Sequence, residues 1–205
     1  MTRVPSALLL VLLLAPPAAA GALSDLLMAP GLFTEAADGP LLAYDEARTV
    51  PPGSPMEPLA EGRIVLAMVG AAADRRLELA RQGTGGTTRP FAEFPSGGAN
   101  PVLLYFLESA VRDLAAATGG NPFYLRNRMR EALVAAGLGP DASPREIAIQ
   151  PFVADRNRAR LGPFADLTLR LRFDAADPGR LLELSADTAR DADGYHHRLT
   201  LVAED

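Results

Sequence analysis

The sequence of 205 residues contains no cysteine, no tryptophan and no lysine, and all 20 of its cationic side chains are arginine. Without cysteine the chain forms no disulfide bonds, lacks the thiolate ligands that zinc sites prefer, and cannot be lipidated as a bacterial lipoprotein. Without lysine it cannot contain a P-loop, because that motif needs a lysine to reach the bound phosphates. The glycine-rich segment Gly83–Gly86 is therefore interpreted as a hairpin loop.

Histidine is scarce as well, since His196 and His197 are the only two. Neighbouring residues on a strand point to opposite faces of the sheet, so this pair cannot bind one metal ion together. Asp191–Gly194 resembles the start of a calcium loop, but Ala189 and Thr200 occupy two positions that need carboxylate ligands. We expect no metal ion and no cofactor.

The formal net charge is −5, which argues against nucleic-acid binding because that function needs a basic surface. The longest apolar run, residues 6–15, follows Arg3 and is shorter than the about 20 residues that span a bilayer. Small residues follow it as far as Ala22. We therefore expect residues 1–22 to be a cleaved signal peptide and the protein to be periplasmic or secreted, without stable membrane insertion. Residues 23–205 are then expected to form a single domain.

Residues 100–137 carry the same helix-start signal twice. Asn100 and Asn121 each precede a proline, and an asparagine cap followed by proline is typical of the first turn of a helix. Apolar residues then recur at intervals of three and four, which indicates two amphipathic helices. We expect Gly119 to end the first helix and Gly137 to end the second.

Short segments with alternating apolar and polar residues flank the helical pair and predict β-strands. Pro90 restricts its own segment to the edge of a sheet. The predicted strands span residues 41–50, 63–69, 76–82, 87–94, 146–153, 164–173, 180–186 and 195–203. This order predicts an α+β fold in which a curved antiparallel sheet of about seven or eight strands packs one face against a two-helix insert.

An Arg-x-Arg-x-Arg pattern occurs twice, at Arg126–Arg130 and at Arg156–Arg160. Arg126 and Arg130 share one face of the predicted helix, whereas Arg156, Arg158 and Arg160 would form a row if their segment were extended. Guanidinium groups bind carboxylates and phosphates in a bidentate manner, so these residues are candidates for contacts with an anionic head group or an acidic partner. In a chain without lysine, the alternative is that they are ordinary solvated cations.

Aromatic residues concentrate around the predicted helices, at Tyr105, Phe106, Phe123 and Tyr124. Core packing explains them first. If the sheet curls around the helices without filling the space completely, the same residues would line an apolar cavity.

Ser96 is the candidate nucleophile of a hydrolase, with His196 or His197 and Asp166 as partners. No G-x-S-x-G motif supports it, and such a triad is defined by geometry rather than by sequence order.

The segments NPVLLYFLE (residues 100–108) and GGNPFYLRNR (residues 119–128) resemble those of a group of uncharacterised exported alphaproteobacterial proteins. That resemblance implies export but no particular activity. The order of strands, helices and strands is also loosely similar to periplasmic lipoprotein-carrier half-barrels, a likeness of architecture alone.

Three functional hypotheses follow from the sequence. The first is a non-enzymatic protein that binds a lipid or another amphiphile between sheet and helices, through the four aromatic residues with Arg126 and Arg130. The second is a module that binds another envelope protein through an edge strand or through Arg156, Arg158 and Arg160. The third is a hydrolase that uses Ser96.

Overall fold

The computed structural model describes residues 22–71, 74–137, 145–174, 176–177, 179–188 and 193–203. Residues 1–21 of the predicted signal peptide lie outside this part of the chain, as do Asp191 and Ala192 of the segment that resembles a calcium loop. Among the described residues, no helix is both long enough and apolar enough to cross a membrane.

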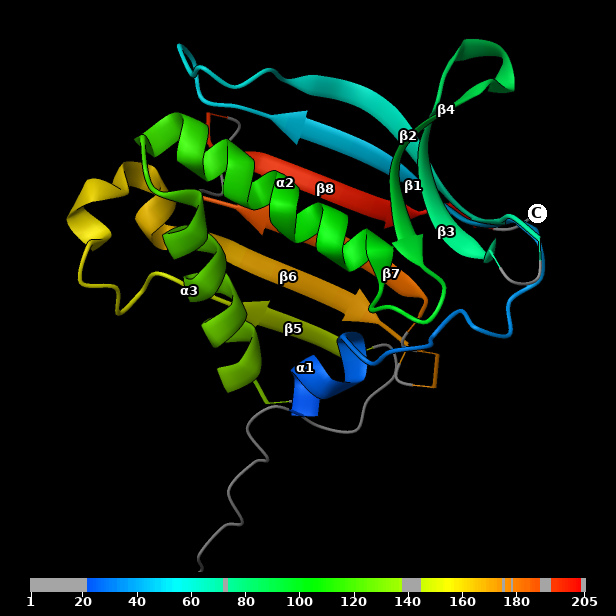
Figure 1. Ribbon diagram of the computed structural model, residues 1–205. Helices are drawn as coiled ribbons and strands as arrows, with labels where there is room; N and C mark the ends of the chain where they lie inside the picture. Colours follow the sequence, from blue (N-terminus) through cyan, green and yellow to red (C-terminus); the bar gives the residue numbers. More distant parts are fainter. Residues whose placement is uncertain are drawn as a thin grey trace, which may run out of the picture.

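Eight strands form one antiparallel sheet in the order β4-β3-β2-β1-β8-β7-β6-β5 (Figure 1). The sheet consists of two four-stranded meanders that are joined where β1 pairs with β8. The strands are β1 (Gly39–Thr49), β2 (Leu59–Val69), β3 (Arg76–Gln82), β4 (Thr88–Pro95), β5 (Arg145–Ile149), β6 (Thr168–Phe173), β7 (Leu181–Asp187) and β8 (His196–Leu201). The predicted α+β class with a curved antiparallel sheet is confirmed.

The helices α1 (Ala22–Leu27), α2 (Pro101–Thr118) and α3 (Pro122–Ala135) lie on one face of this sheet (Figure 1). Both asparagine caps form as predicted: the side chain of Asn100 accepts from the amides of Val102 and Leu103, and that of Asn121 accepts from the amide of Phe123. Gly119 ends α2 with a φ of 65°, a left-handed conformation that glycine adopts without steric cost.

Several predicted boundaries are wrong. β2 starts at Leu59, four residues before the predicted residue 63, and β8 ends at Leu201 instead of residue 203. β5 stops at Ile149 instead of residue 153, because Pro151 has no N–H to donate and residues 151–154 form a turn. β6 starts at Thr168 instead of residue 164, since Gly162–Asp166 forms the 3₁₀ helix η4. α3 ends at Ala135, two residues before the predicted stop at Gly137. Ala136 already has an extended backbone, although its N–H still binds the oxygen of Ala132.

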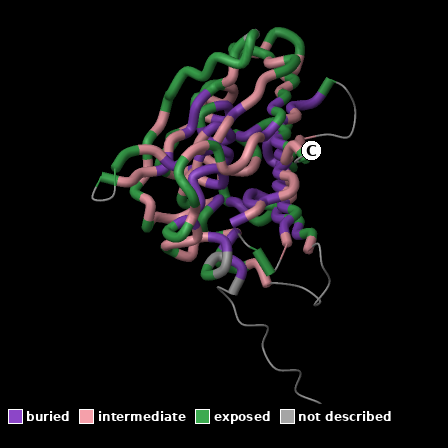
Figure 2. Tube along the Cα trace, turned by 90° about the vertical axis from the view of Figure 1, so that its right-hand side faces the viewer, coloured by how far each residue is buried: buried purple, intermediate pink, exposed green. Residues whose placement is uncertain are grey.

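The core lies between the sheet and the helices, and Figure 2 shows the buried parts of the trace gathered in the interior. Alternate residues of each strand face it, as Leu169, Leu171 and Phe173 do on β6. α2 contributes the opposite side with a stripe that includes Leu103 and Phe106. The period of two in the strands and the helical period in α2 thus meet in one apolar layer.

α2 also buries three polar residues, Tyr105, Ser109 and Asp113, at intervals of four. The hydroxyl of Tyr105 donates to Oε1 of Glu46 on β1 over 2.7 Å. Nε2 of His197 on β8 lies 3.0 Å from the same oxygen, and the guanidinium of Arg81 on β3 lies 2.9 Å from Oε2. The buried carboxylate of Glu46 is therefore bound from three elements at once.

A second carboxylate, that of Asp113 on α2, is held by Arg48, which lies two residues after Glu46 on β1. Nη1 of Arg48 lies 3.0 Å from both of its oxygens, and the hydroxyl of Tyr195 donates over 2.7 Å. A buried charge is costly unless it is paired and hydrogen-bonded, so each of these contacts fits only one placement of α2 on the sheet. Polar contacts thus fix the register of a helix that is otherwise held by non-directional apolar packing.

The way the stability of the fold decreases at acidic pH tests the Glu46 cluster. Burial alone would raise the pKa of Glu46, but hydrogen bonds from His197 and Tyr105, together with the charges of His197 and Arg81, outweigh it and lower the pKa to about 2. Because the pKa of Glu46 is lower in the folded state than its ordinary value of 4.5, its carboxylate stabilises the fold at pH values above 4.5. This stabilisation is lost as the pH falls towards about 2. Glu46→Gln should therefore lower the free energy of unfolding by roughly 3 kcal/mol near pH 7, with a gap to wild type that closes towards pH 2.

Urea unfolding at several pH values measures this gap. The exposed Glu57 offers the control, because Glu57→Gln should leave both the stability and its pH dependence unchanged. If the difference in the free energy of unfolding between Glu46→Gln and wild type stayed constant from neutral to acidic pH, the lowered pKa of Glu46 would be contradicted.

The two asparagine caps form a matched pair with different surroundings. Asn100 is fully buried and also donates from Nδ2 to the carbonyl of Gly179 over 3.0 Å, whereas Asn121 is exposed and only caps its helix. We expect Asn121→Ala to cost about 1 kcal/mol and Asn100→Ala about 2–3 kcal/mol, because the latter also leaves a buried carbonyl without its donor. Chemical denaturation of both variants checks this order, and equal losses would refute it.

Candidate functional site

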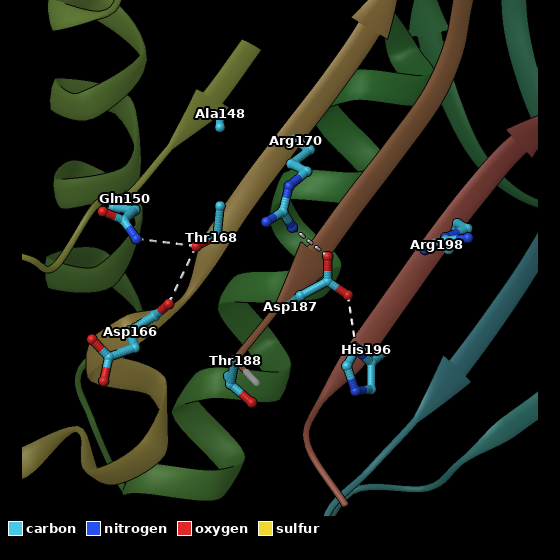
Figure 3. Close-up of a pocket in the computed structure, with 9 residues that line it drawn as sticks. All are labelled: Ala148, Gln150, Asp166, Thr168, Arg170, Asp187, Thr188, His196 and Arg198. Carbon is cyan, nitrogen blue, oxygen red and sulfur yellow. Dashed lines mark hydrogen bonds and ion pairs between the residues drawn. The ribbon is translucent and has the colours of Figure 1, made fainter. Parts of the chain in front are cut away.

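In the described part of the chain, three cavities lie on the face of the sheet that is opposite the helices. The largest, here called the polar cavity, has a volume of about 610 Å³ and opens over β6, β7 and β8 (Figure 3). Its lining consists of Ala148, Gln150, Asp166, Thr168, Arg170, Asp187, Thr188, His196 and Arg198.

Asp187 organises the polar cavity. Its Oδ1 lies 2.8 Å from Nδ1 of His196, and its Oδ2 accepts from Arg170 over 3.0 Å (Figure 3). Oδ2 also accepts from the hydroxyl of Ser185 over 2.9 Å. On the opposite side, Nε2 of Gln150 lies 3.3 Å from the hydroxyl of Thr168. The cavity thus combines fixed charged groups with hydroxyl and amide groups that both donate and accept hydrogen bonds.

Two further cavities continue across the same face. The middle cavity, of about 390 Å³, is lined by Asp45, Glu46, Ala47, Ala60, Glu61, Gly62, Arg63, Arg198 and Thr200. The apolar cavity, of about 540 Å³, is lined by Pro40, Leu41, Leu42, Ala43, Arg63, Val65, Gln82, Gly86, Thr88, Leu201, Val202 and Ala203. Arg198 lines both the polar and the middle cavity, and Arg63 lines both the middle and the apolar cavity. The three cavities are therefore adjacent and are together called the outer groove.

Both register irregularities between β1 and β2 lie in the lining of the outer groove. One falls between Pro40 and Leu42 beside the apolar cavity, and the other between Glu46 and Arg48 beside the middle cavity. An additional residue on one strand bends the sheet and increases its twist locally, which is why such bulges often shape functional surfaces.

The structure separates the six residues predicted to bind a ligand. Tyr105 belongs to the Glu46 cluster, and Phe106 is buried with its ring stacked on His197 at 5.3 Å between centroids. Phe123 has 73% of its surface exposed, and the guanidinium of Arg126 lies 5.4 Å from the centre of its ring.

The other members of the six also lie apart. The hydroxyl of Tyr124 donates to Asp155, Arg126 is paired with Glu108, and Arg130 is exposed. A single ligand site made of all six residues is therefore not assembled, and their role in binding stays a prediction.

The second arginine pattern does not form an extended row. Arg158–Arg160 makes the 3₁₀ helix η3, in which Arg158 donates to the carbonyl of Ala165 over 2.6 Å and pairs with Asp166. Arg156 and Arg160 are exposed. The condition under which the three arginines would line up is thus not met, because two consecutive tight turns replace the strand.

The residues of the proposed hydrolase are engaged elsewhere. His196 binds Asp187 on the outer face, His197 binds Glu46 on the inner face, and Asp166 pairs with Arg158. No described hydrogen bond links Ser96 to either histidine. The prediction that the two histidines face opposite sides of the sheet is confirmed. Among the described residues, no group of three or more His, Asp or Glu side chains is placed to bind a metal ion.

No family model, curated protein or solved structure matches this chain. No residue role can therefore be transferred from a relative, and the resemblances noted for the sequence stay predictions.

The outer groove was missed by sequence reasoning, which placed the candidate ligand site between the sheet and the helices. The available signal was the type of residue at those positions. On β6 and β8 they include Thr168, Arg170 and Arg198, whereas on β1 and β2 they include Ala43 and Val65. Only the strand order shows that these two sets belong to one continuous surface.

Asp155 links the second arginine pattern to the first and offers a test of that link. It is buried and accepts from the hydroxyl of Tyr124 over 2.8 Å, from Nε of Arg128 over 2.9 Å and from the amide of Asn157 over 2.6 Å. Burial alone would raise the pKa of Asp155, but these hydrogen bonds and the charge of Arg128 lower it.

We expect Asp155→Ala to lower the free energy of unfolding by about 2–4 kcal/mol, because it leaves several donors without their acceptor. The exposed Asp166 gives the matched control, and Asp166→Ala should cost less than about 1 kcal/mol. Urea titration measures both, and similar losses would show that Asp155 is no more than a surface ion pair.

Proposed function

We propose that this protein is a non-enzymatic binding protein that holds one elongated amphiphile in the outer groove. The head group lies in the polar cavity and the acyl chain extends over the middle cavity to the apolar cavity. The observation that carries the proposal is the continuity of the linings, because Arg198 and Arg63 join the three cavities. The two end cavities differ: the polar cavity is lined by charged, hydroxyl and amide groups, and the apolar cavity mainly by aliphatic residues, while the middle cavity between them has charged and small residues.

The polar end suits a head group that has a single negative charge and hydroxyl groups. Arg170 is held in place by Asp187, and a fixed guanidinium binds an anionic oxygen with little additional loss of side-chain freedom. Thr168, Gln150 and Thr188 supply groups that match hydroxyls because they both donate and accept. Asp187 and Asp166 limit the negative charge that the cavity accepts.

The apolar end suits a hydrocarbon chain. Leu41, Ala43, Val65 and Val202 supply aliphatic surface there. Each methylene group removed from water contributes about 0.8 kcal/mol, so a short segment of chain outweighs the weak polar contacts at the other end. Small outward residues on β1 and β2 leave room for it, since longer side chains would fill the surface.

The proposal keeps the class of ligand that the sequence suggested and moves the site. The space between α2 and the sheet contains Phe106 and the Glu46 cluster, whose groups already bind one another. A ligand there would have to displace these contacts, whereas the outer groove is open. Export to the periplasm or secretion remains part of the proposal and rests on residues 1–22 and on the resemblance to exported proteins.

Isothermal titration calorimetry with lysomyristoyl phosphatidylglycerol, kept below its micelle concentration, tests the site. We expect saturable binding that Arg170→Ala at the polar end and Val65→Gln at the apolar end each weaken about tenfold, which corresponds to about 1.4 kcal/mol. The matched controls are Arg172→Ala on β6 and Ala67→Gln on β2, which change the same face of the same strands outside the cavity linings.

Two results would overturn the proposed site. One is equal binding by wild type, Arg170→Ala and Val65→Gln. The other is loss of binding in Phe123→Ala and Arg126→Ala with the groove variants unaffected, which would favour the site predicted from the sequence.

A further inference from the structure

The six arginines of the two patterns divide into two groups by their contacts. Arg126, Arg128 and Arg158 are held by carboxylates that lie elsewhere in the chain, and they tie α3 to α2 and to the loop of residues 150–167. Their partners are Glu108 for Arg126, Asp155 and Glu131 for Arg128, and Asp166 for Arg158. These three arginines have structural roles.

The other three, Arg130, Arg156 and Arg160, are exposed and form no ion pair within the described part of the chain. Asp155 brings the two patterns together, because it binds both Tyr124 and Arg128 of α3 and directly precedes Arg156. The two patterns together contain six arginines, and the ion pairs of these arginines use four carboxylates, those of Glu108, Glu131, Asp155 and Asp166, in a chain whose net charge is −5. The two arginine patterns therefore lie at the same end of the molecule, where the loop of residues 150–167 runs beside α3 (Figure 1).

Two apolar side chains protrude from the same region. Phe123, in the first turn of α3, is 73% exposed, and Val153, in the turn before Asp155, is 60% exposed. They are the most exposed of the large apolar residues in the described chain. Large exposed apolar side chains that are surrounded by cations are typical of surfaces that contact a membrane interface.

We infer that Phe123, Val153, Arg130, Arg156 and Arg160 form a docking surface for a bilayer that contains anionic phospholipid. The two apolar side chains enter the interface between head groups and acyl chains, and the arginines bind lipid phosphates. Arginine suits this place because its aliphatic stem packs on apolar surface while its guanidinium stays with the head groups. A folded acidic partner is the alternative, but it would have to enclose a protruding ring, and a fluid interface accepts one without a preformed pocket.

The docking surface adjoins one end of the outer groove. Gln150 and Asp166, which flank the loop that carries Val153, Arg156 and Arg160, both line the polar cavity. Docking would therefore bring the polar cavity close to the bilayer. The inference does not depend on the groove, and its test does not measure groove binding.

Flotation with vesicles provides the first test. We expect the full-length protein to float with vesicles of phosphatidylcholine and phosphatidylglycerol at low salt, to bind weakly to pure phosphatidylcholine, and to dissociate at about 0.5 M salt. Arg130→Ala/Arg156→Ala should lower the affinity about thirtyfold, since each arginine near an anionic surface contributes about fivefold. The charge-matched control is Arg89→Ala/Arg172→Ala, which removes two exposed arginines from the strands β4 and β6 and should not change flotation.

The absence of tryptophan allows a second, local test. Phe123→Trp introduces a single tryptophan at the docking surface, and its emission should shift to the blue and be quenched by brominated acyl chains when anionic vesicles are added. Phe91→Trp on β4 is the control, and its emission should not respond. Because all variants share the same N-terminal segment, any contribution from that segment is common to all of them.

The outcomes are distinct. Loss of flotation in the arginine double variant, with quenching at position 123 alone, supports the docking surface. Equal flotation of both double variants, no response of the tryptophan at position 123, or binding to polyglutamate without binding to vesicles would each overturn it, the last in favour of an acidic protein. Binding of lysolipid in solution by Arg130→Ala/Arg156→Ala reports on the groove separately, so failure of one proposal is not mistaken for failure of the other.

Discussion

The fold depends on how β1 is bound to α2. β1 is the strand that joins the two meanders, since it pairs with β2 on one side and with β8 on the other. On its inner face, Glu46 and Arg48 bind Tyr105 and Asp113 of α2. Apolar contacts alone tolerate sliding of a helix over a sheet, whereas a buried carboxylate with three partners does not. The contacts between β1 and α2 therefore set the position of the helix and hold the centre of the sheet together.

Most of the architecture was predictable from local signals, and the interactions that fix it were not. Alternation over residues 168–173 and the caps at Asn100 and Asn121 are short-range patterns, so the elements that they indicate appear in the structure. The Glu46 cluster joins residues that are as many as 151 positions apart, and no local pattern reports such a contact. Alternation also continued through residues 164–167, where Pro163 and tight 3₁₀ turns prevailed over a strand-like pattern.

The arginine patterns illustrate the same limit. The spacing of Arg126, Arg128 and Arg130 is identical to that of Arg156, Arg158 and Arg160, yet in each pattern the partners decide what a given arginine does. Carboxylates bring Arg126, Arg128 and Arg158 into the fold and leave the others exposed. Because those carboxylates come from α2, from the turn before η3 and from η4, the sequence identified the charge but not its division between structure and surface.

The outer groove and the core are two consequences of one strand register. On β8, His197 points inward to Glu46 while His196 points outward to Asp187, so the core cluster and the polar cavity are built from adjacent residues. A shift of β8 by one residue would exchange them, exposing one histidine and burying the other. The fully satisfied contacts of Glu46 thus oppose any register that would disturb the polar cavity. The contacts on the inner face thereby fix the positions of the side chains on the outer face. This explains how a groove can form on a side of the sheet that no helix supports.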